Sequence, residues 1–277
     1  MERAEPGTRG STASVDGRVL HQPSAPPMAA NLALRDSARP LLPRLEGPPK
    51  RSWRSRRRLV STPVHRGIVA VDIEDSTSRT NPIKEELRGT VYRVLVRALR
   101  AVGIGDHHLD RLADRGDGVL ALVRPADEIP KTLLIDPLIP TLAALLSDYN
   151  SGVPALEHPA RQLRLRTVVH AGEVHDDGNG FFGEPLDVAF RLLDAPPVRK
   201  RLRRTTGSLV LVVSDEIFWS IVWQGYNRID KRTYEPLVHV RVAGRPHRGW
   251  VHSPGEAAAL ARGGGPRPAE EAVIEGA

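Results

Sequence analysis

Cysteine is absent from the 277 residues of the chain. Disulfides, thiolate catalysis and cysteine-based zinc sites are therefore excluded, and the absence fits a reducing compartment, so we expect a cytoplasmic protein. Aromatic residues make up only 4 % of the chain, which leaves Val, Leu, Ala and Ile to build the core. Lysine supplies only 5 of the 40 basic residues, and such a preference for arginine is typical of a high-G+C bacterial genome.

Long hydrophobic runs are missing as well. Asp136, Pro137 and Pro140 interrupt the most apolar stretch, whereas a membrane span needs about 20 apolar residues. The N-terminus also lacks the short apolar block of a secretion signal. We therefore expect neither a membrane span nor export.

Positive charge is concentrated at one end of the chain. Residues 1–66 carry 13 Lys and Arg against 5 Asp and Glu, a net charge of +8, whereas the remaining residues carry 27 against 28. A nucleic-acid-binding domain needs its positive excess on the folded face. The distribution therefore argues against specific nucleic-acid binding.

Composition divides the chain into three parts. Residues 1–64 hold nine prolines and no sustained apolar period, which predicts a disordered basic tail. Its run Arg51–Arg58 is interpreted as a solvated linker, with weak contact to anionic surfaces as the alternative. Residues 65–253 are the predicted folded domain, and residues 254–277, rich in Gly, Ala, Pro and Glu, are predicted to be a flexible tail.

Apolar runs alternate with amphipathic segments along the folded part. Apolar runs, or apolar residues alternating with polar ones as in the first half of residues 163–174, predict strands. The predicted strands cover residues 68–73, 163–174, 209–213, 238–242 and 249–252. Amphipathic spacing predicts helices, and these cover residues 82–102, 140–150, 185–193 and 215–223, the last capped by Ser214. With a hairpin around residue 117, this order predicts an α+β fold in which helices pack over a mixed sheet.

Two aspartates stand where predicted strands end. Asp72 closes the first strand, and Asp117 lies in the turn Gly116–Gly118, which is tight enough for an antiparallel hairpin. If the hairpin lies beside the first strand, the two carboxylates converge and suit a hard divalent cation such as Mg²⁺. The alternative is that each aspartate only begins a loop. We expect Glu74 to be exposed to solvent and not to be a ligand of the cation.

Four motifs resemble those of the class III nucleotidyl cyclase homology domain, the family of adenylate and guanylate cyclases. The matching segments are DIEDST at Asp72–Thr77, GDG at Gly116–Gly118, HAGEV at His170–Val174 and LDVAFR at Leu186–Arg191. They resemble the family's D-I-x-G-F-T, G-D, H-x-G and V-N-x-A-x-R, in the same order across residues 68–252. The resemblance implies a ferredoxin-like mixed sheet, and we interpret the chain as a divergent member of actinobacterial type.

The resemblance also implies an activity. Two ions, Mg²⁺ or Mn²⁺, would be held by Asp72, Asp117 and the backbone carbonyl of Ile73, and would convert a nucleoside triphosphate into a 3′,5′-cyclic nucleotide and pyrophosphate. Asp187 and Arg191 share one helix face because they are four residues apart. The family's residues at these positions orient the ribose and stabilise the transition-state phosphate across a head-to-tail homodimer.

Departures from the family pattern concern the nucleotide. Asp187 replaces the family's asparagine and places a negative charge near phosphate. Ala113 and Gly180 stand at the base-selecting positions without polar side chains, so the nucleobase is not identified. The family's triphosphate-binding lysine is missing, and guanidinium groups suit phosphate oxygens. The candidate replacements are Arg241, Arg245 and Arg248.

Two classes of function remain open. The first is a nucleotidyl cyclase, favoured because Asp72, Asp117 and Arg191 are all retained. The second is a cyclase-like regulatory module that binds a nucleotide or a protein without turnover, favoured by Asp187 and the missing lysine. A third, weaker hypothesis is that the basic tail is the functional part and docks the folded domain on anionic surfaces.

Overall fold

The computed structural model describes residues 62–254. Predictions made for residues 1–61 and 255–277, including the basic run Arg51–Arg58, lie outside the described residues.

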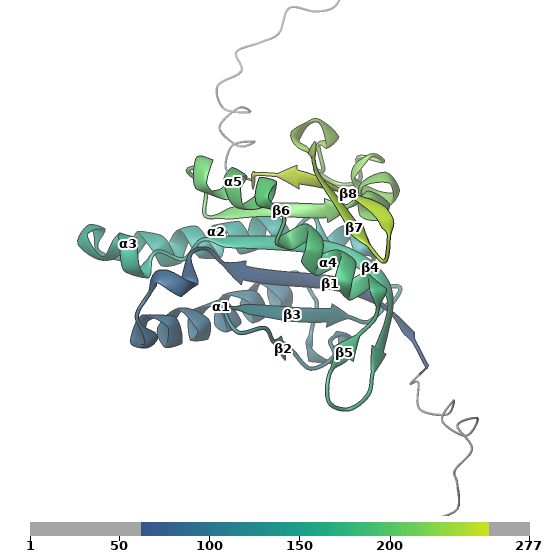
Figure 1. Ribbon diagram of the computed structural model, residues 1–277, viewed down its shortest axis with the longest axis horizontal. Helices are drawn as coiled ribbons and strands as arrows, with labels where there is room; N and C mark the ends of the chain where they lie inside the picture. Colours follow the sequence, from purple (N-terminus) through teal and green to yellow (C-terminus); the bar gives the residue numbers. More distant parts are fainter. Residues whose placement is uncertain (1–61, 255–277) are drawn as a thin grey trace, which may run out of the picture. The chain divides into compact units, whose positions relative to one another are not determined.

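A mixed eight-stranded sheet forms the centre of the described part (Figure 1). Its strands are β1 Val64–Ile73, β2 Ala113–Asp114, β3 Gly118–Val123, β4 Leu165–Asp176, β5 Phe181–Phe182, β6 Leu209–Ser214, β7 Glu235–Val242 and β8 Arg245–His252. The spatial order is β2-β3-β1-β4-β6-β8-β7, and β5 pairs with β4 beyond the end of β1. Only β4 and β6 are parallel. This arrangement confirms the predicted α+β fold with a ferredoxin-like mixed sheet.

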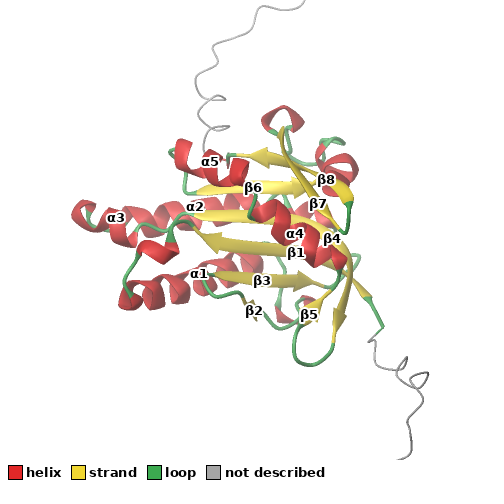
Figure 2. Ribbon diagram, in the orientation of Figure 1, coloured by secondary structure: helices red, strands yellow, loops and turns green. Residues whose placement is uncertain are grey.

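Helices cover both faces of the sheet (Figure 2). They are α1 Asn81–Ala101, α2 Leu138–Ser151, α3 His158–Arg161, α4 Glu184–Leu193, α5 Pro196–Arg204 and α6 Asp215–Ile217, which continues as a π-helical turn over Phe218–Val222. Alternate residues of β1 enter two different cores, because successive side chains of a strand point to opposite faces. Val69 and Val71 pack with α1 and α2, whereas Ile68 and Ala70 pack with α4 and α5.

Helix α5 is the main element that the sequence analysis missed. Its segment begins with two prolines and carries five basic residues, and no helix is predicted there. Val198 and Leu202 are nonetheless fully buried against the sheet. Their spacing of four residues, with proline in the first turn, is the signal that predicts a short amphipathic helix.

Residues 131–151 form the one helical stretch, among those described, that is long and apolar enough to cross a membrane, with a mean hydropathy of 1.2. Its side chains Leu138, Ile139, Leu142 and Leu146 are buried in the core. A core helix passes the same test of length and composition, so this candidate is weak evidence for a span.

Aromatic side chains gather where α6 packs on the sheet. Phe218 stacks on Trp250 with ring centroids 3.5 Å apart, and Trp219 lies edge-on to Trp250. The indole N–H groups of Trp219 and Trp250 both donate to Asp215 Oδ1, at 3.1 and 2.8 Å. The predicted cap is present as well, because Ser214 Oγ accepts a hydrogen bond from the Ile217 N–H. These contacts fix α6 to β8.

Candidate functional site

The end of β1 and the β2–β3 hairpin lie side by side. Asp72 is the register partner of Gly118, and the Ile73 N–H donates to the Asp117 carbonyl at 3.3 Å. Gly118 permits this approach, because a Cβ there would collide with the Val71 carbonyl and lie 3.3 Å from Asp72 Oδ1. The structure therefore brings Asp72, Ile73 and Asp117 to one end of the sheet, as the sequence predicts.

Each of the two carboxylates has its own partner. Asp72 forms an ion pair with Arg166, which lies directly opposite it on β4. The Asp117 carboxylate accepts a hydrogen bond from Ser76 Oγ, just beyond β1. Arg166 is a site residue that the sequence analysis missed, because its place beside Asp72 depends on a long-range strand register.

Arg166 is buried but only partly satisfied. The residue is 8 % exposed, and its Nε and Nη1 donate no hydrogen bond within the described residues. Nη1 lies 3.8 Å from Asp194 Oδ1, which is too far for a hydrogen bond. Burial lowers the pKa of Arg166, and the nearby positive charge of Arg199 lowers it further. Unused donors on a buried cation leave room for an anionic ligand.

A pocket of about 260 Å³ opens beside these groups, and we call it the carboxylate pocket. It is lined by Ile73, Glu74, Asp75, Ser76, Thr77, Asp117, Arg166, Arg199, Leu202 and Arg203. The acidic lining comes from the hairpin and the segment after β1, whereas the basic lining comes from β4 and α5. The pocket thus offers negative charge from one set of elements and positive charge from another.

Glu74 is not solvated as predicted. Its side chain is 13 % exposed, and its Oε2 lies 3.2 Å from Arg164 Nη1. Burial raises the pKa of Glu74, and the positive charge of Arg164 opposes that rise. The prediction was wrong because the Arg164 side chain pairs with Glu74 at this end of the strand.

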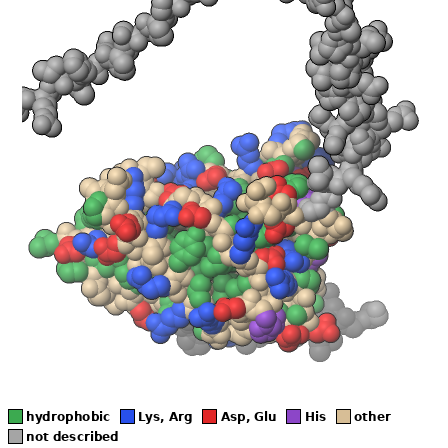
Figure 3. All heavy atoms as spheres, turned by 90° about the horizontal axis from the view of Figure 1, so that it is seen from below, with side chains coloured by type: hydrophobic (Ala, Val, Ile, Leu, Met, Phe, Trp, Pro, Cys, Tyr) green, Lys and Arg blue, Asp and Glu red, His purple; other side chains and the backbone are tan. Residues whose placement is uncertain are grey.

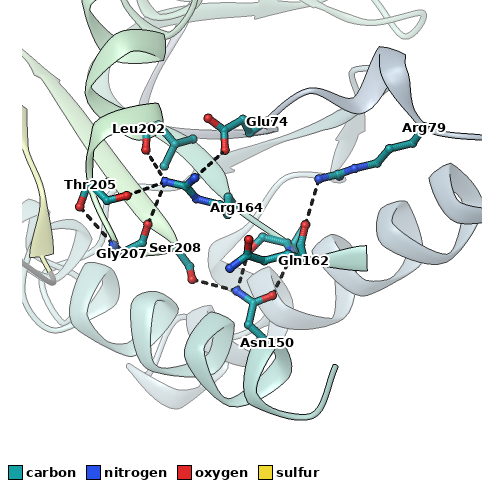
Figure 4. Close-up of polar contacts among 10 residues, drawn as sticks. Glu74, Arg79, Asn150, Gln162, Arg164, Leu202, Thr205, Gly207 and Ser208 are labelled. Carbon is teal, nitrogen blue, oxygen red and sulfur yellow. Dashed lines mark hydrogen bonds and ion pairs between the residues drawn. The ribbon is translucent and has the colours of Figure 1, made fainter. Parts of the chain in front are cut away.

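Arg164 ties α5 to the rest of the site (Figure 4). Its Nη2 donates to the carbonyls of Leu202, Thr205 and Gly207, with the last two at 2.9 and 3.4 Å. These carbonyls lie at the C-terminal end of α5 and in the turn that follows it. The Arg164 guanidinium therefore joins the end of α5 to the segment after β1 through Glu74.

The available donors fit a divalent cation that arrives with phosphate. No group of three or more Asp, Glu, His or Cys side chains in residues 62–254 could hold a metal ion. Two carboxylates and the Ile73 carbonyl are hard oxygen donors, and Mg²⁺ is commonly bound by one or two carboxylates together with substrate phosphates. The residues therefore fit Mg²⁺ or Mn²⁺ as part of a metal–nucleotide complex.

The predicted catalytic pair lies in a second pocket. Asp187 and Arg191 are exposed on α4 and line a pocket of about 790 Å³ together with Arg241, and we call it the α4 pocket. Their side chains form no ion pair with each other or with any other described residue. The α4 pocket and the carboxylate pocket have no lining residue in common.

The other predicted nucleotide-binding positions are distributed around the α4 pocket. Arg245 is bound to Glu184 at the start of α4, and Arg248 is exposed outside the pocket. Ala113 is half-buried on β2, and Gly180 faces open space. Neither of these two positions offers a side-chain hydrogen bond to a nucleobase.

Charges of both signs share the surface of the described domain. Figure 3 shows Lys and Arg side chains interspersed with Asp and Glu over one face. A groove that tracks a nucleic-acid backbone presents one sign of charge. The face in Figure 3 does not have that character.

Comparisons with known proteins found similarity at the level of structure. No family model and no curated protein match the sequence. The guanylyl cyclase Cya2 is 16 % identical with a TM-score of 0.47, and the match covers 69 % of this chain and 93 % of that one. The adenylate/guanylate cyclase/hydrolase from Silicibacter pomeroyi is 16 % identical with a TM-score of 0.46, covering 69 % and 98 %. The adenylyl cyclase CyaB from P. aeruginosa is 12 % identical with a TM-score of 0.45, covering 69 % and 94 %. Similarity at this level assigns no activity to the chain.

Proposed function

We propose that this protein is a nucleotidyl cyclase that converts a nucleoside triphosphate into a 3′,5′-cyclic nucleotide and pyrophosphate with two Mg²⁺ or Mn²⁺ ions. The observation that carries the proposal is the meeting of Asp72, Ile73 and Asp117 beside the buried guanidinium of Arg166. Oxygen donors that can bind metal ions lie next to a guanidinium that can bind phosphate. This arrangement matches the charges of a metal–triphosphate complex.

Each residue of the site would have its own role in the reaction. When bound, the two ions make the ribose 3′-hydroxyl easier to deprotonate and stabilise charge on the phosphates. Asp72, Asp117 and the Ile73 carbonyl would hold the ions, and Ser76 orients the Asp117 carboxylate through its hydrogen bond. The unused donors of Arg166 bind oxygens of the departing phosphates.

The reaction itself is a displacement at the α-phosphorus. The ribose 3′-oxygen forms a bond to this phosphorus and loses its proton to solvent. The bond between the α-phosphorus and the bridging oxygen to the β-phosphate breaks, and pyrophosphate leaves with that oxygen. Negative charge accumulates on the leaving group, so the nearby guanidinium lowers the barrier.

A homodimer would complete each site. Asp187, Arg191 and Arg241 line the α4 pocket, which shares no lining residue with the carboxylate pocket of the same chain. The two pockets adjoin where Asp194 of the α4 pocket accepts a hydrogen bond from Arg199. In a head-to-tail pair, these three residues of one copy would meet the carboxylate pocket of the other. Arg191 is exposed and unpaired within the described residues, and would bind the α-phosphate, while Asp187 would accept a hydrogen bond from ribose.

The Asp72–Arg166 ion pair favours a second candidate, a regulatory module that binds nucleotide without turnover. In this alternative Arg166 stays on Asp72, so one metal position remains closed and the nucleotide is bound but not converted.

The test is to incubate the full chain with ATP, GTP, CTP and UTP in turn with Mn²⁺, and to detect cyclic product by mass spectrometry. We expect product from at least one nucleotide, and its loss in Asp72→Ala and Asp117→Ala variants. The absence of product from all four, with nucleotide binding retained, would instead establish the regulatory module.

A further inference from the structure

We infer that Arg199 and Arg203 of α5 form, with Arg166, a binding site within a single chain for the terminal phosphates of the nucleotide. This inference deepens the proposed function and rests on it for the identity of the ligand. It assigns to α5 a role that Arg241, Arg245 and Arg248 were predicted to fill.

The geometry of α5 places the two arginines on one side of the helix. They are four residues apart, so they share a face, and both line the carboxylate pocket. Val198 and Leu202 are buried on the adjoining face and hold the helix against the sheet. Arg164 fastens the end of the helix through three backbone carbonyls (Figure 4).

Hydrogen-bonding capacity in this cluster is largely unused. Arg199 Nη2 donates to Asp194 at 3.1 Å, and Arg203 forms no hydrogen bond or ion pair with any residue in the described range. Arg166 Nε and Nη1 are buried and have no acceptor among residues 62–254. Three guanidinium groups around one pocket repel each other, as the effect of Arg199 and Arg203 on the pKa of Arg166 shows. An anionic ligand would relieve that repulsion and accept hydrogen bonds from the unused N–H groups.

The chemistry of the pocket selects phosphate over a single carboxylate. The same pocket is lined by Arg166, Arg199 and Arg203 and by Asp117 and Ser76, beside which the proposed metal ions would bind. A ligand that contacts both groups must carry several acidic oxygens and bind divalent cations, which a pyrophosphate group does. Glu74 is a negative charge at the same pocket, but Arg164 neutralises it at 3.2 Å.

The test measures inorganic pyrophosphate and nucleotide binding by calorimetry in the presence of Mn²⁺. The Arg199→Gln/Arg203→Gln double variant is compared with wild type and with Arg204→Gln, a matched control on an exposed position of α5 outside the pocket. We expect the double variant to bind pyrophosphate and triphosphates about 10- to 100-fold more weakly, because charge-assisted hydrogen bonds are lost. Nucleoside monophosphate affinity should not change, and the control should bind as wild type.

The outcomes separate this inference from the catalytic proposal. If the double variant binds pyrophosphate as well as the control does, the inference is overturned, even where cyclic product still forms. Failure of wild type to bind pyrophosphate also overturns it. If no nucleotide yields cyclic product but the double variant still loses pyrophosphate binding, the α5 site stands and the cyclase proposal falls.

Discussion

Replacing Arg164 by leucine should destabilise the protein and displace α5. The substitution removes the donor to three carbonyls and leaves Glu74 without its cation. Arg164 and Glu74 side chains are 19 % and 13 % exposed, so solvent replaces these contacts only in part. Breaking a buried ion pair costs about 3–5 kcal/mol, and we expect about 3 kcal/mol here after allowance for partial exposure.

The assay is urea unfolding of the full chain followed by far-ultraviolet circular dichroism. Arg204→Leu is the control, because Arg204 is exposed on the same helix. Adding Glu74→Gln to Arg164→Leu should recover about 1 kcal/mol, since the unpaired buried charge is then gone. An Arg164→Leu protein within about 0.5 kcal/mol of wild type would refute the reasoning, as would strict additivity of the two substitutions.

Three other perturbations test different parts of the site and fold. Gly118→Ala should cost about 2 kcal/mol in urea unfolding and abolish product, because its Cβ meets the Val71 carbonyl; wild-type stability would show that the hairpin approaches β1 less closely. Arg166→Gln should free Asp72, so that Mn²⁺ alone binds about tenfold tighter by electron paramagnetic resonance while pyrophosphate binds more weakly; unchanged Mn²⁺ affinity would contradict competition for Asp72. Burial lowers the pKa of His170 from 6.5 to about 4, so the unfolded chain takes up a proton first and stability falls as pH drops from about 6.5 to 4. The loss should reach about 3 kcal/mol and should shrink in His170→Gln; equal acid sensitivity of the two proteins would count against the buried neutral imidazole.

The sheet and the hairpin were predictable because their signals are local. Residues 68–73 are apolar except for Asp72, and residues 209–213 are apolar throughout; both strands prove to be covered on two faces. The Gly116–Gly118 turn predicted the hairpin, and Gly116 has a positive φ of 80°, a conformation that favours glycine. These features follow from neighbouring residues alone, so the sequence is sufficient for them.

The basic half of the site could not be predicted in the same way. Arg166 sits beside Asp72 only through the register of β1 with β4, which joins residues 94 positions apart. Glu74 was predicted to be solvated because its partner Arg164 is far away in the sequence. Helix α5 itself has a readable signal in the spacing of Val198 and Leu202, although five of its residues are basic. A high density of basic residues therefore does not exclude burial of one helix face.

The aromatic cluster at α6 has a spectroscopic consequence. Three of the four tryptophans of the chain, Trp219, Trp223 and Trp250, belong to it or adjoin it, and none of them lines the carboxylate pocket. Intrinsic fluorescence of the folded domain therefore reports on the corner where α6 meets β8. A change in emission intensity or wavelength would indicate that the structure at this corner is lost. An unchanged emission spectrum during nucleotide titration is expected of a protein that binds its ligand elsewhere.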